Sequence, residues 1–322
     1  MLPFKILIPV IILIVLPLSF WQPNVLNNIR QAATSVVIPP TPAAKPAPVS
    51  TPTPTLTPTP SPTPRPLPTW TPTPKAIKPT QAPPVAINTA PPGAGHERRS
   101  VVTNVGAFNV DVIGADLGST RVIVDTASDS TCTNNCPVLP LATYAARNGA
   151  YAAVNGSFFC PDTYPQCAGK TNSFDTLLMN KNKVYFNSDN NVYSVVPAVI
   201  FSSGSIRFVG RSLEWGRDTS PDSVIANYPL LISGGQDIYS GSGDPKFTNK
   251  GTRDFVANKG NMVYIGTIWG ATMDDAAKVL KAMGMDNALN LDEGGSTALW
   301  YGGSYLAGPG RNLPNAVLFV RK

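Results

Sequence analysis

The stretch NALNLDEGGSTALW contains the residues best suited to chemistry. The mostly apolar residues 288–291 predict a strand that delivers Asp292 at its end, two residues before the run Gly294, Gly295 and Ser296. Two consecutive glycines let backbone amides point into one concavity that binds an anion, and a serine can add a hydroxyl donor. A carboxylate beside such a nest can act as a general base or as a cation ligand. The alternative is that this segment is only a polar turn between two strands.

Three further predicted strands have polar residues or glycines at their ends. Asn155 and Gly156 follow an apolar strand, and the two phenylalanines that come next either hold a sugar ring or belong to the core. Arg253 begins another strand, either as a bidentate phosphate clamp or as a solvated rim residue. The run YPLLISGG ends in a double glycine that starts at Gly234. Together with the Asp292 loop, these strand ends predict one common rim.

The single histidine of the chain, His96, excludes several kinds of chemistry. It lies where a flexible linker is expected to meet the folded domain, so it is not expected to serve a Ser-His-Asp or Cys-His catalytic set. A zinc or iron centre based on histidine needs two or three of them. The remaining candidates are carboxylates, Arg, Lys, amides, hydroxyls or an oxygen-ligated cation such as calcium. No cofactor is required by the sequence.

The four cysteines predict disulfides and an oxidising compartment. Cys132, Cys136, Cys160 and Cys167 form an even set within the expected domain. Their spacings, with three and six residues between neighbours, suit a four-cysteine zinc site less well than disulfide bonds. Three pairings are compatible with the sequence.

Patterning along residues 97–322 predicts a β-rich α+β domain with a mixed sheet and few helices. Alternating apolar residues predict strands at 107–117 and 121–127, joined by a turn at Gly118 and Ser119 into a hairpin. A short helix is expected at 141–148. Further hairpins are expected at 175–186, 194–210 and 253–268.

One longer helix is well specified by its ends. Thr272 is expected as its N-cap with Asp275 three residues later, and Gly284 lies beyond its last turn. Between these ends, Ala276 and Leu280 belong to one apolar face, which should pack on the sheet.

The formal charge of +6 does not indicate a nucleic-acid partner. Residues 1–96 contain six Lys or Arg and no acidic residue, whereas residues 97–322 contain 19 basic and 19 acidic residues. Binding to phosphate backbones requires an excess of positive charge. We therefore expect no nucleic-acid binding by the folded domain, and we expect it to be a monomer.

The first 96 residues predict an anchor and a stalk. Residues 6–21 carry no charge and follow Lys5, so residues 1–22 act either as an uncleaved signal anchor in the membrane or as a signal peptide. Residues 23–96 form a disordered Pro/Thr-rich linker, because 20 of the 34 prolines fall between Pro39 and Pro92. This arrangement predicts an extracytoplasmic domain that is anchored to the membrane, or secreted if the signal is cleaved.

The sequence resembles the phosphodiester glycosidase family, which is named for the lysosomal enzyme that uncovers mannose 6-phosphate by removing a covering N-acetylglucosamine. The resemblance covers most of residues 100–322. It runs in order through AAVNGSFF, YPLLISGG, the Arg253 strand, the 272–284 helix, ALNLDEGGST and RNLPNAV. Each motif is weak alone, but their order and spacing are specific.

Three residues depart from the pattern of the family. Ser157 and Glu293 stand where glycine is usual, and Asp254 stands where a threonine commonly follows the arginine. Glu293 brings a second carboxylate beside Asp292, which would either repel a phosphodiester or bind a cation that attracts one.

The resemblance implies a hydrolase that splits a sugar-1-phosphodiester in a surface or envelope glycan. Asp292 would position water or a cation, Asn155 would contact sugar or phosphate oxygens, and Arg253 would hold phosphate together with the Gly294–Ser296 amides. Gly156, Gly234 and Glu293 would complete the substrate site. The alternatives are a non-catalytic module that binds cell-wall glycans and a transferase that moves a glycan or glycan-phosphate between polymers.

Overall fold

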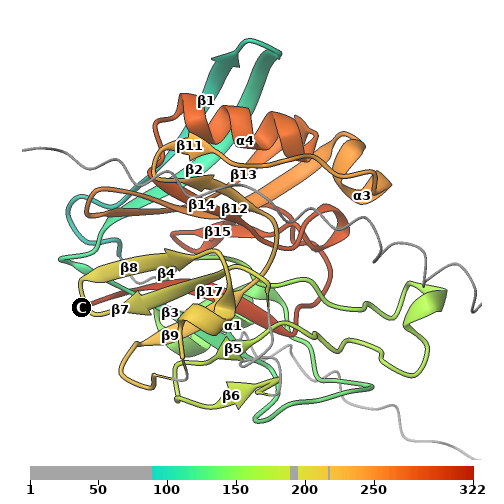
Figure 1. Cartoon of the computed structure of the whole chain (residues 1–322). Coiled ribbons are helices and arrows are strands. Elements are labelled where there is room, and N and C mark those ends of the chain that lie inside the picture. Colours follow the sequence, from blue (N-terminus) through green and yellow to red (C-terminus); the bar gives the residue numbers. More distant parts are fainter. Residues whose placement is uncertain (1–88, 189–194, 217) are drawn as a thin grey trace, which may run out of the picture. The chain divides into compact units, whose positions relative to one another are not determined.

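The structure is a computed structural model, and it describes residues 89–188, 195–216 and 218–322 (Figure 1). The expected anchor at residues 1–22 and the expected linker up to residue 88 lie outside the described residues. None of the helices in the described part is long and apolar enough to cross a membrane.

The strands form three sheets in which every pair is antiparallel. The seven-stranded sheet has the order β1-β2-β13-β12-β14-β10-β11 and consists of β1 (Gly95–Thr103), β2 (Gly106–Asp116), β10 (Leu230–Ser233), β11 (Gln236–Asp237), β12 (Gly251–Lys259), β13 (Met262–Ala271) and β14 (Asn287–Asn290). One five-stranded sheet has the order β16-β15-β4-β17-β3 and consists of β3 (Thr120–Thr126), β4 (Ala150–Asn155), β15 (Leu299–Tyr301), β16 (Ser304–Ala307) and β17 (Asn315–Arg321). The other has the order β6-β5-β9-β7-β8 and consists of β5 (Leu178–Met179), β6 (Tyr185–Phe186), β7 (Ala198–Ser202), β8 (Ser205–Val209) and β9 (Ser223–Ala226).

Few helices accompany these sheets, which confirms the predicted β-rich α+β class. They are α1 (Leu141–Asn148), α3 (Pro245–Thr248), α4 (Met273–Ala282) and the short 3-10 turns η1 (Pro165–Cys167), η2 (Ser212–Glu214) and η3 (Gly294–Ser296). The predicted capping of α4 is confirmed, because Thr272 accepts a hydrogen bond from the Asp275 amide while the Asp275 carboxylate accepts one from the Thr272 amide. Helix α1 ends as predicted at Gly149, whose φ of +62° suits a glycine.

The prediction of a hairpin across Gly118 and Ser119 was wrong. β2 belongs to the seven-stranded sheet, whereas β3 pairs with β17 in a five-stranded sheet. The chain therefore changes sheets at this turn. The hairpins β5–β6, β7–β8 and β12–β13 form as predicted.

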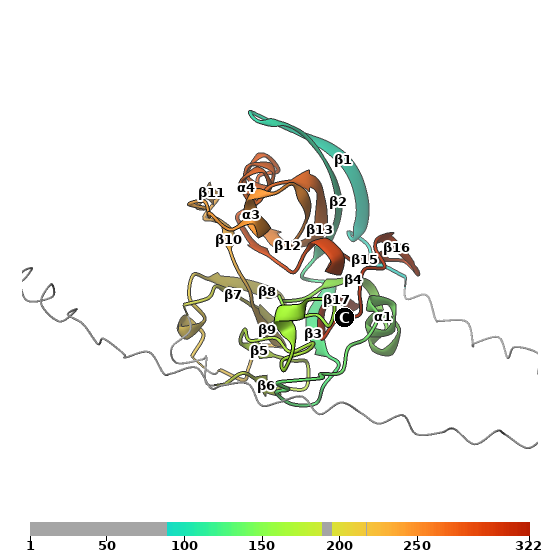
Figure 2. The same cartoon turned by 90° about the vertical axis from the view of Figure 1, so that its right-hand side faces the viewer.

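The sheets enclose a shared core and carry helices on their outer faces (Figures 1 and 2). α4 covers one face of the seven-stranded sheet, where Ala276 and Leu280 pack against Ile268 and Phe255. α1 packs in the same way on the sheet that contains β4 and β17. Both faces of β4 are thus buried, and its end is a rigid position for a functional residue.

His96 lies inside the fold and not in a flexible linker as the sequence suggested. It belongs to β1, and its Nε2 lies 3.0 Å from Oδ1 of the buried Asp111. Trp269 donates from Nε1 to the other oxygen of Asp111 at 2.8 Å. Ala90 and Ala94, which precede β1, also pack against the shared core.

These contacts predict that the N-terminal boundary of the folded unit lies before residue 97. A chain that begins at Thr89 should fold and melt cooperatively. A chain that begins at Glu97 should melt several degrees lower, because it loses Ala90, Ala94 and the His96–Asp111 contact. Equal melting temperatures in differential scanning calorimetry would show that these contacts contribute nothing.

Candidate active site

A pocket of about 630 Å³ lies where the ends of β12 and β14 meet the loop that follows β4. Its walls include carboxylates, cations and an aromatic side chain, namely Asp292, Glu293, Arg253, Lys246, Arg311 and Tyr164. The structure therefore brings Asp292, Arg253 and Glu293 together as predicted, along with Gly294 and Gly295. Asn155, Gly156, Ser296 and Gly234 are not among the residues that line it.

Asn155 positions the Asp292 loop from beneath. Its side chain is fully buried at the end of β4, where Nδ2 donates to the Asp292 carbonyl oxygen at 2.6 Å. Its Oδ1 accepts from the Ala298 amide at 3.0 Å. Because both ends of the side-chain amide are bonded to the main chain, Asn155 is a positioning residue and not the substrate contact that was expected.

Gly156 and Ser157 pack against a neighbouring strand. A Cβ on Gly156 would lie 1.8 Å from Oδ1 of Asn315, so only glycine fits this close approach. The same oxygen accepts from the Ser157 amide at 2.9 Å, and the Ser157 side chain is buried. Gly156 also accepts a hydrogen bond from the Asp292 amide through its carbonyl oxygen, at 2.8 Å. Gly234 lies in the turn between β10 and β11 with a φ of +56°.

Arg253 is occupied by protein groups. Its Nη1 lies 2.6 Å from Oε1 of Glu293, in a pair that is buried on both sides. Its guanidinium also donates to main-chain carbonyl oxygens of Ala271, Lys246 and Asn249. The side chain therefore joins β12 to the segment around α3. The Glu293 carboxylate occupies the position that a bound phosphate would take if Arg253 were a phosphate clamp.

The glycine turn has its own internal partners. The Gly294 amide donates to Oγ1 of Thr252 at 3.2 Å, and the Ser296 amide donates to the Glu293 carbonyl oxygen at 3.3 Å. Two of the amides expected to hold an anion are thus already engaged. Gly295 has another role, because a Cβ there would lie 2.1 Å from Nη2 of Arg311.

Lys246 and Arg311 are the cations that sequence reasoning missed. Lys246 is exposed on α3, and its Nζ lies 3.0 Å from the centre of the Phe158 ring. The guanidinium of Arg311 lies over the Tyr164 ring, 5.1 Å from its centre, and rests on Gly295. RNLPNAV contained a signal for Arg311, whereas nothing in the sequence around Lys246 distinguished it from a solvated lysine.

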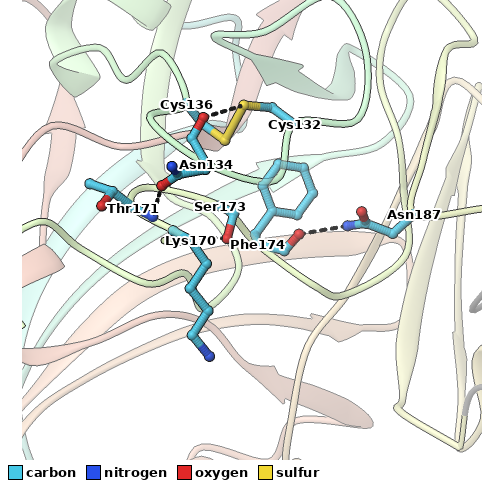
Figure 3. Close-up of a disulfide and its surroundings, with 8 residues drawn as sticks. All are labelled: Cys132, Asn134, Cys136, Lys170, Thr171, Ser173, Phe174 and Asn187. Carbon is cyan, nitrogen blue, oxygen red and sulfur yellow. Dashed lines mark hydrogen bonds between the residues drawn. A yellow bond between two sulfur atoms is a disulfide. The ribbon is translucent and has the colours of Figure 1, made fainter. Parts of the chain in front are cut away.

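Two disulfides organise one wall of the pocket. The bonds join Cys132 to Cys136 and Cys160 to Cys167, which resolves the three pairings left open by the sequence. The second bond closes the loop that presents Tyr164 to the pocket. Figure 3 shows that the first bond holds the segment that follows this loop, because Asn134, between its two cysteines, accepts from the Thr171 amide at 2.9 Å.

Burial disfavours charge on three carboxyl groups at this site. It raises the pKa of Asp292 to about 6, against a hydrogen bond from Ser296 and the charges of Lys246 and Arg311. Burial likewise raises the pKa of Glu293 to about 7, even though Arg253 is its partner. Asp254 lies fully buried and accepts from Oγ1 of Thr267 at 2.6 Å, and its pKa rises to about 8.

In the part of the chain that the structure describes, no three His, Cys, Asp or Glu side chains are grouped so as to hold a metal ion. The role of calcium stays a prediction from the sequence.

The family profile of the phosphodiester glycosidases matches residues 148–320, which is more than half of the chain. The chain belongs to the phosphodiester glycosidase family. A comparison with curated proteins gives no match.

A solved structure shows the same fold as this domain. The catalytic domain of zebrafish N-acetylglucosamine-1-phosphodiester alpha-N-acetylglucosaminidase, auto-inhibited by its pro-peptide, is 15% identical with a TM-score of 0.55. That match covers 71% of this chain and 83% of the zebrafish domain. A hypothetical protein from Synechocystis matches at 15% identity and a TM-score of 0.49, over 71% of this chain. The chain spans 62% of the length of the Synechocystis protein.

The three departures from the phosphodiester glycosidase pattern have different surroundings. Ser157 is buried against Asn315, away from the residues that line the pocket. Glu293 lines the pocket and pairs with Arg253. Asp254 lies in the core behind them, within electrostatic reach of Glu293 and Asp292.

The buried carboxyl of Asp254 predicts a pH-dependent stability. An unfolded aspartate ionises near pH 4, whereas folded Asp254 remains protonated to about pH 8, so its favourable contribution is lost as the pH rises through this range. Asp254→Asn should therefore raise the melting temperature by a few degrees at pH 8, and the gain should shrink at pH 5. Thermal unfolding at both pH values measures the difference. A variant that is less stable at pH 8 would show that the ionised carboxylate is required.

The contacts of Arg253 predict a stability effect for Arg253→Lys. Lysine cannot bond to three carbonyl groups and Glu293 together, so the melting temperature should fall by on the order of 10 °C. Arg207→Lys, on exposed β8, is the matched control and should hardly change it. Lost turnover with an unchanged melting temperature would instead make Arg253 a substrate clamp.

Proposed function

We propose that this domain is an extracytoplasmic hydrolase that cleaves the bond between a sugar's anomeric carbon and a phosphodiester oxygen in a surface or envelope glycan. The observation that carries the proposal is that buried Asp292 shares one pocket with Lys246 and Arg311. A carboxylate can activate water, and cations can stabilise a departing phosphate. Membership of the phosphodiester glycosidase family supports the same class of bond.

In the proposed reaction, Asp292 accepts a proton from a water molecule whose oxygen attacks the anomeric carbon. The bond from that carbon to the phosphate oxygen breaks, and its electron pair leaves with the phosphate. The products are a free sugar and a phosphate monoester. Because this leaving group is a good one, charge stabilisation by Lys246 and Arg311 matters more than a strong general acid.

Phosphate binding is assigned to Lys246 and Arg311, not to Arg253. The Arg253 guanidinium is neutralised by Glu293 and bonded to three carbonyl groups. The Tyr164 ring and Gly295 hold Arg311 in place. Tyr164 lies in the loop closed by the Cys160–Cys167 bond, so this loop also orients the Arg311 guanidinium. The first substrate to test is an α-N-acetylglucosamine 1-phosphodiester, the class of bond named for the zebrafish enzyme.

An extracytoplasmic location is part of the proposal. Disulfide bonds persist in oxidising compartments, and this domain contains two of them. The uncharged segment 6–21 would act as a signal anchor or signal peptide, and the proline-rich linker would carry the domain away from the membrane.

Asp292→Asn tests the proposed chemistry, because it removes the charge and keeps nearly the same shape. Turnover of the diester should fall by a factor on the order of a hundred or more, the usual contribution of a positioned base. The melting temperature should not fall, because the substitution removes a buried carboxyl group whose charge is disfavoured. Asp274→Asn, on the exposed side of α4, serves as the matched control and should leave turnover intact.

Normal turnover by Asp292→Asn would remove Asp292 from the mechanism. Saturable binding by the unaltered protein without release of free sugar would instead indicate a glycan-binding module. Transfer of the sugar to an added glycan in place of water would indicate a transferase.

A further inference from the structure

Glu293 differs from two carboxylates that are buried away from the pocket. It is 8% exposed and lines the pocket, and its Oε1 lies 2.6 Å from Nη1 of Arg253. Its other oxygen, Oε2, is buried without a hydrogen-bond partner among the described residues. By contrast, Asp111 and Asp125 have partners on both of their oxygens. Buried carboxylates that serve the fold are normally fully hydrogen-bonded, so packing alone does not explain Glu293.

Arg253 has enough other partners to stay in place without Glu293. Its guanidinium donates to the main-chain carbonyl oxygens of Ala271, Lys246 and Asn249. These carbonyl groups are neutral, whereas the Glu293 carboxylate is an ion-pair partner that cancels the charge. Loss of this carboxylate would therefore leave an uncompensated positive charge in the wall of the pocket.

The charges that line the pocket match a ligand with one negative charge. Among the described residues, the lining contains four basic and three acidic side chains, namely Lys246, Lys250, Arg253, Arg311, Asp244, Asp292 and Glu293. Burial raises the pKa of Glu293 to about 7 and that of Asp292 to about 6, so at pH 8 both are ionised. The lining then carries one net positive charge. A phosphodiester carries one negative charge, whereas a phosphate monoester carries close to two at this pH.

We propose that Glu293 is a specificity-determining residue, an internal anion that occupies Arg253 so that the pocket holds a monoanionic phosphodiester and disfavours a dianionic phosphate monoester. This inference rests on the proposed function, because the monoester is the product of that reaction. A dianion meets twice the repulsion from the Glu293 carboxylate that a monoanion meets at the same place. Weaker retention of the monoester also frees the pocket after each turnover.

Binding of two small phosphate esters to the full chain tests this role without any turnover. Methyl phosphate is a dianion at pH 8, and dimethyl phosphate is a monoanion that is larger by one methyl group. Glu293→Gln removes the charge and keeps nearly the same shape. In phosphorus NMR titrations at pH 8, this variant should bind methyl phosphate about tenfold more tightly than the unaltered protein does. The gain for dimethyl phosphate should be only about threefold, because the electrostatic free energy scales with the charge of the ligand.

Two further variants make the result specific. Asp244→Asn is the matched control, because Asp244 also lines the pocket but is exposed, so solvent screens its charge. Asparagine also keeps the N-cap bond that Asp244 accepts from the Lys246 amide. Either affinity should change by less than about twofold in this control. Glu293→Gly removes the carboxylate altogether and should reproduce the two gains of Glu293→Gln.

Three results would overturn the role of Glu293. The first is an equal gain for both esters, and the second is unchanged affinities in both Glu293 variants. The third is loss of the cooperative thermal transition in both variants, which would assign the ion pair to stability. Failure of the proposed hydrolysis is a separate result. If the unaltered protein cleaves no diester while its Glu293 variants gain affinity for methyl phosphate, the hydrolase is lost and the charge selectivity of the pocket stands.

Discussion

Asn155 stands at the end of β4 with both ends of its side-chain amide bonded to the main chain of a distant segment, at Asp292 and Ala298. That segment contains the glycine turn and delivers the proposed base to the pocket. β4 is itself fixed by pairing with β15 and β17 and by the helix packed behind it. Replacing Asn155 by an apolar residue would leave two buried main-chain groups unpaired, so the position of Asp292 depends on this amide together with the Gly156 carbonyl oxygen.

The charged groups at the site differ in how far protein partners occupy them. Arg253 pairs with Glu293 and donates to three main-chain carbonyl oxygens, although both side chains line the pocket. Lys246 and Arg311 line the same pocket and rest on the aromatic rings of Phe158 and Tyr164. The arginine with the most protein partners thus serves the fold, while the other two cations remain available to an anion.

Much of the fold could be predicted because the local sequence patterns agree with the elements that form. The capping residues of α4 and the glycine after α1 act within one turn, and three hairpins are held by short polar turns. The change of sheet between β2 and β3 could not be predicted from the sequence, because a turn does not indicate with which strands its two flanking strands pair. Asp292 was found from its strand-end position, whereas the roles of Asn155 and Arg253 depended on partners far along the chain. Lys246 could not be identified as a site residue from the sequence, because its contact with the Phe158 ring joins residues that are far apart in the chain.

The loop between β4 and β5 supplies four residues to the wall of the pocket, namely Phe159, Pro161, Tyr164 and Gln166. It is braced by its own disulfide and by a bond from the Cys132–Cys136 segment. Asp292, Lys246 and Arg311 belong to other parts of the chain. Substitutions in this one loop can therefore reshape the pocket wall, while Asp292 keeps the support that Asn155 gives it from β4.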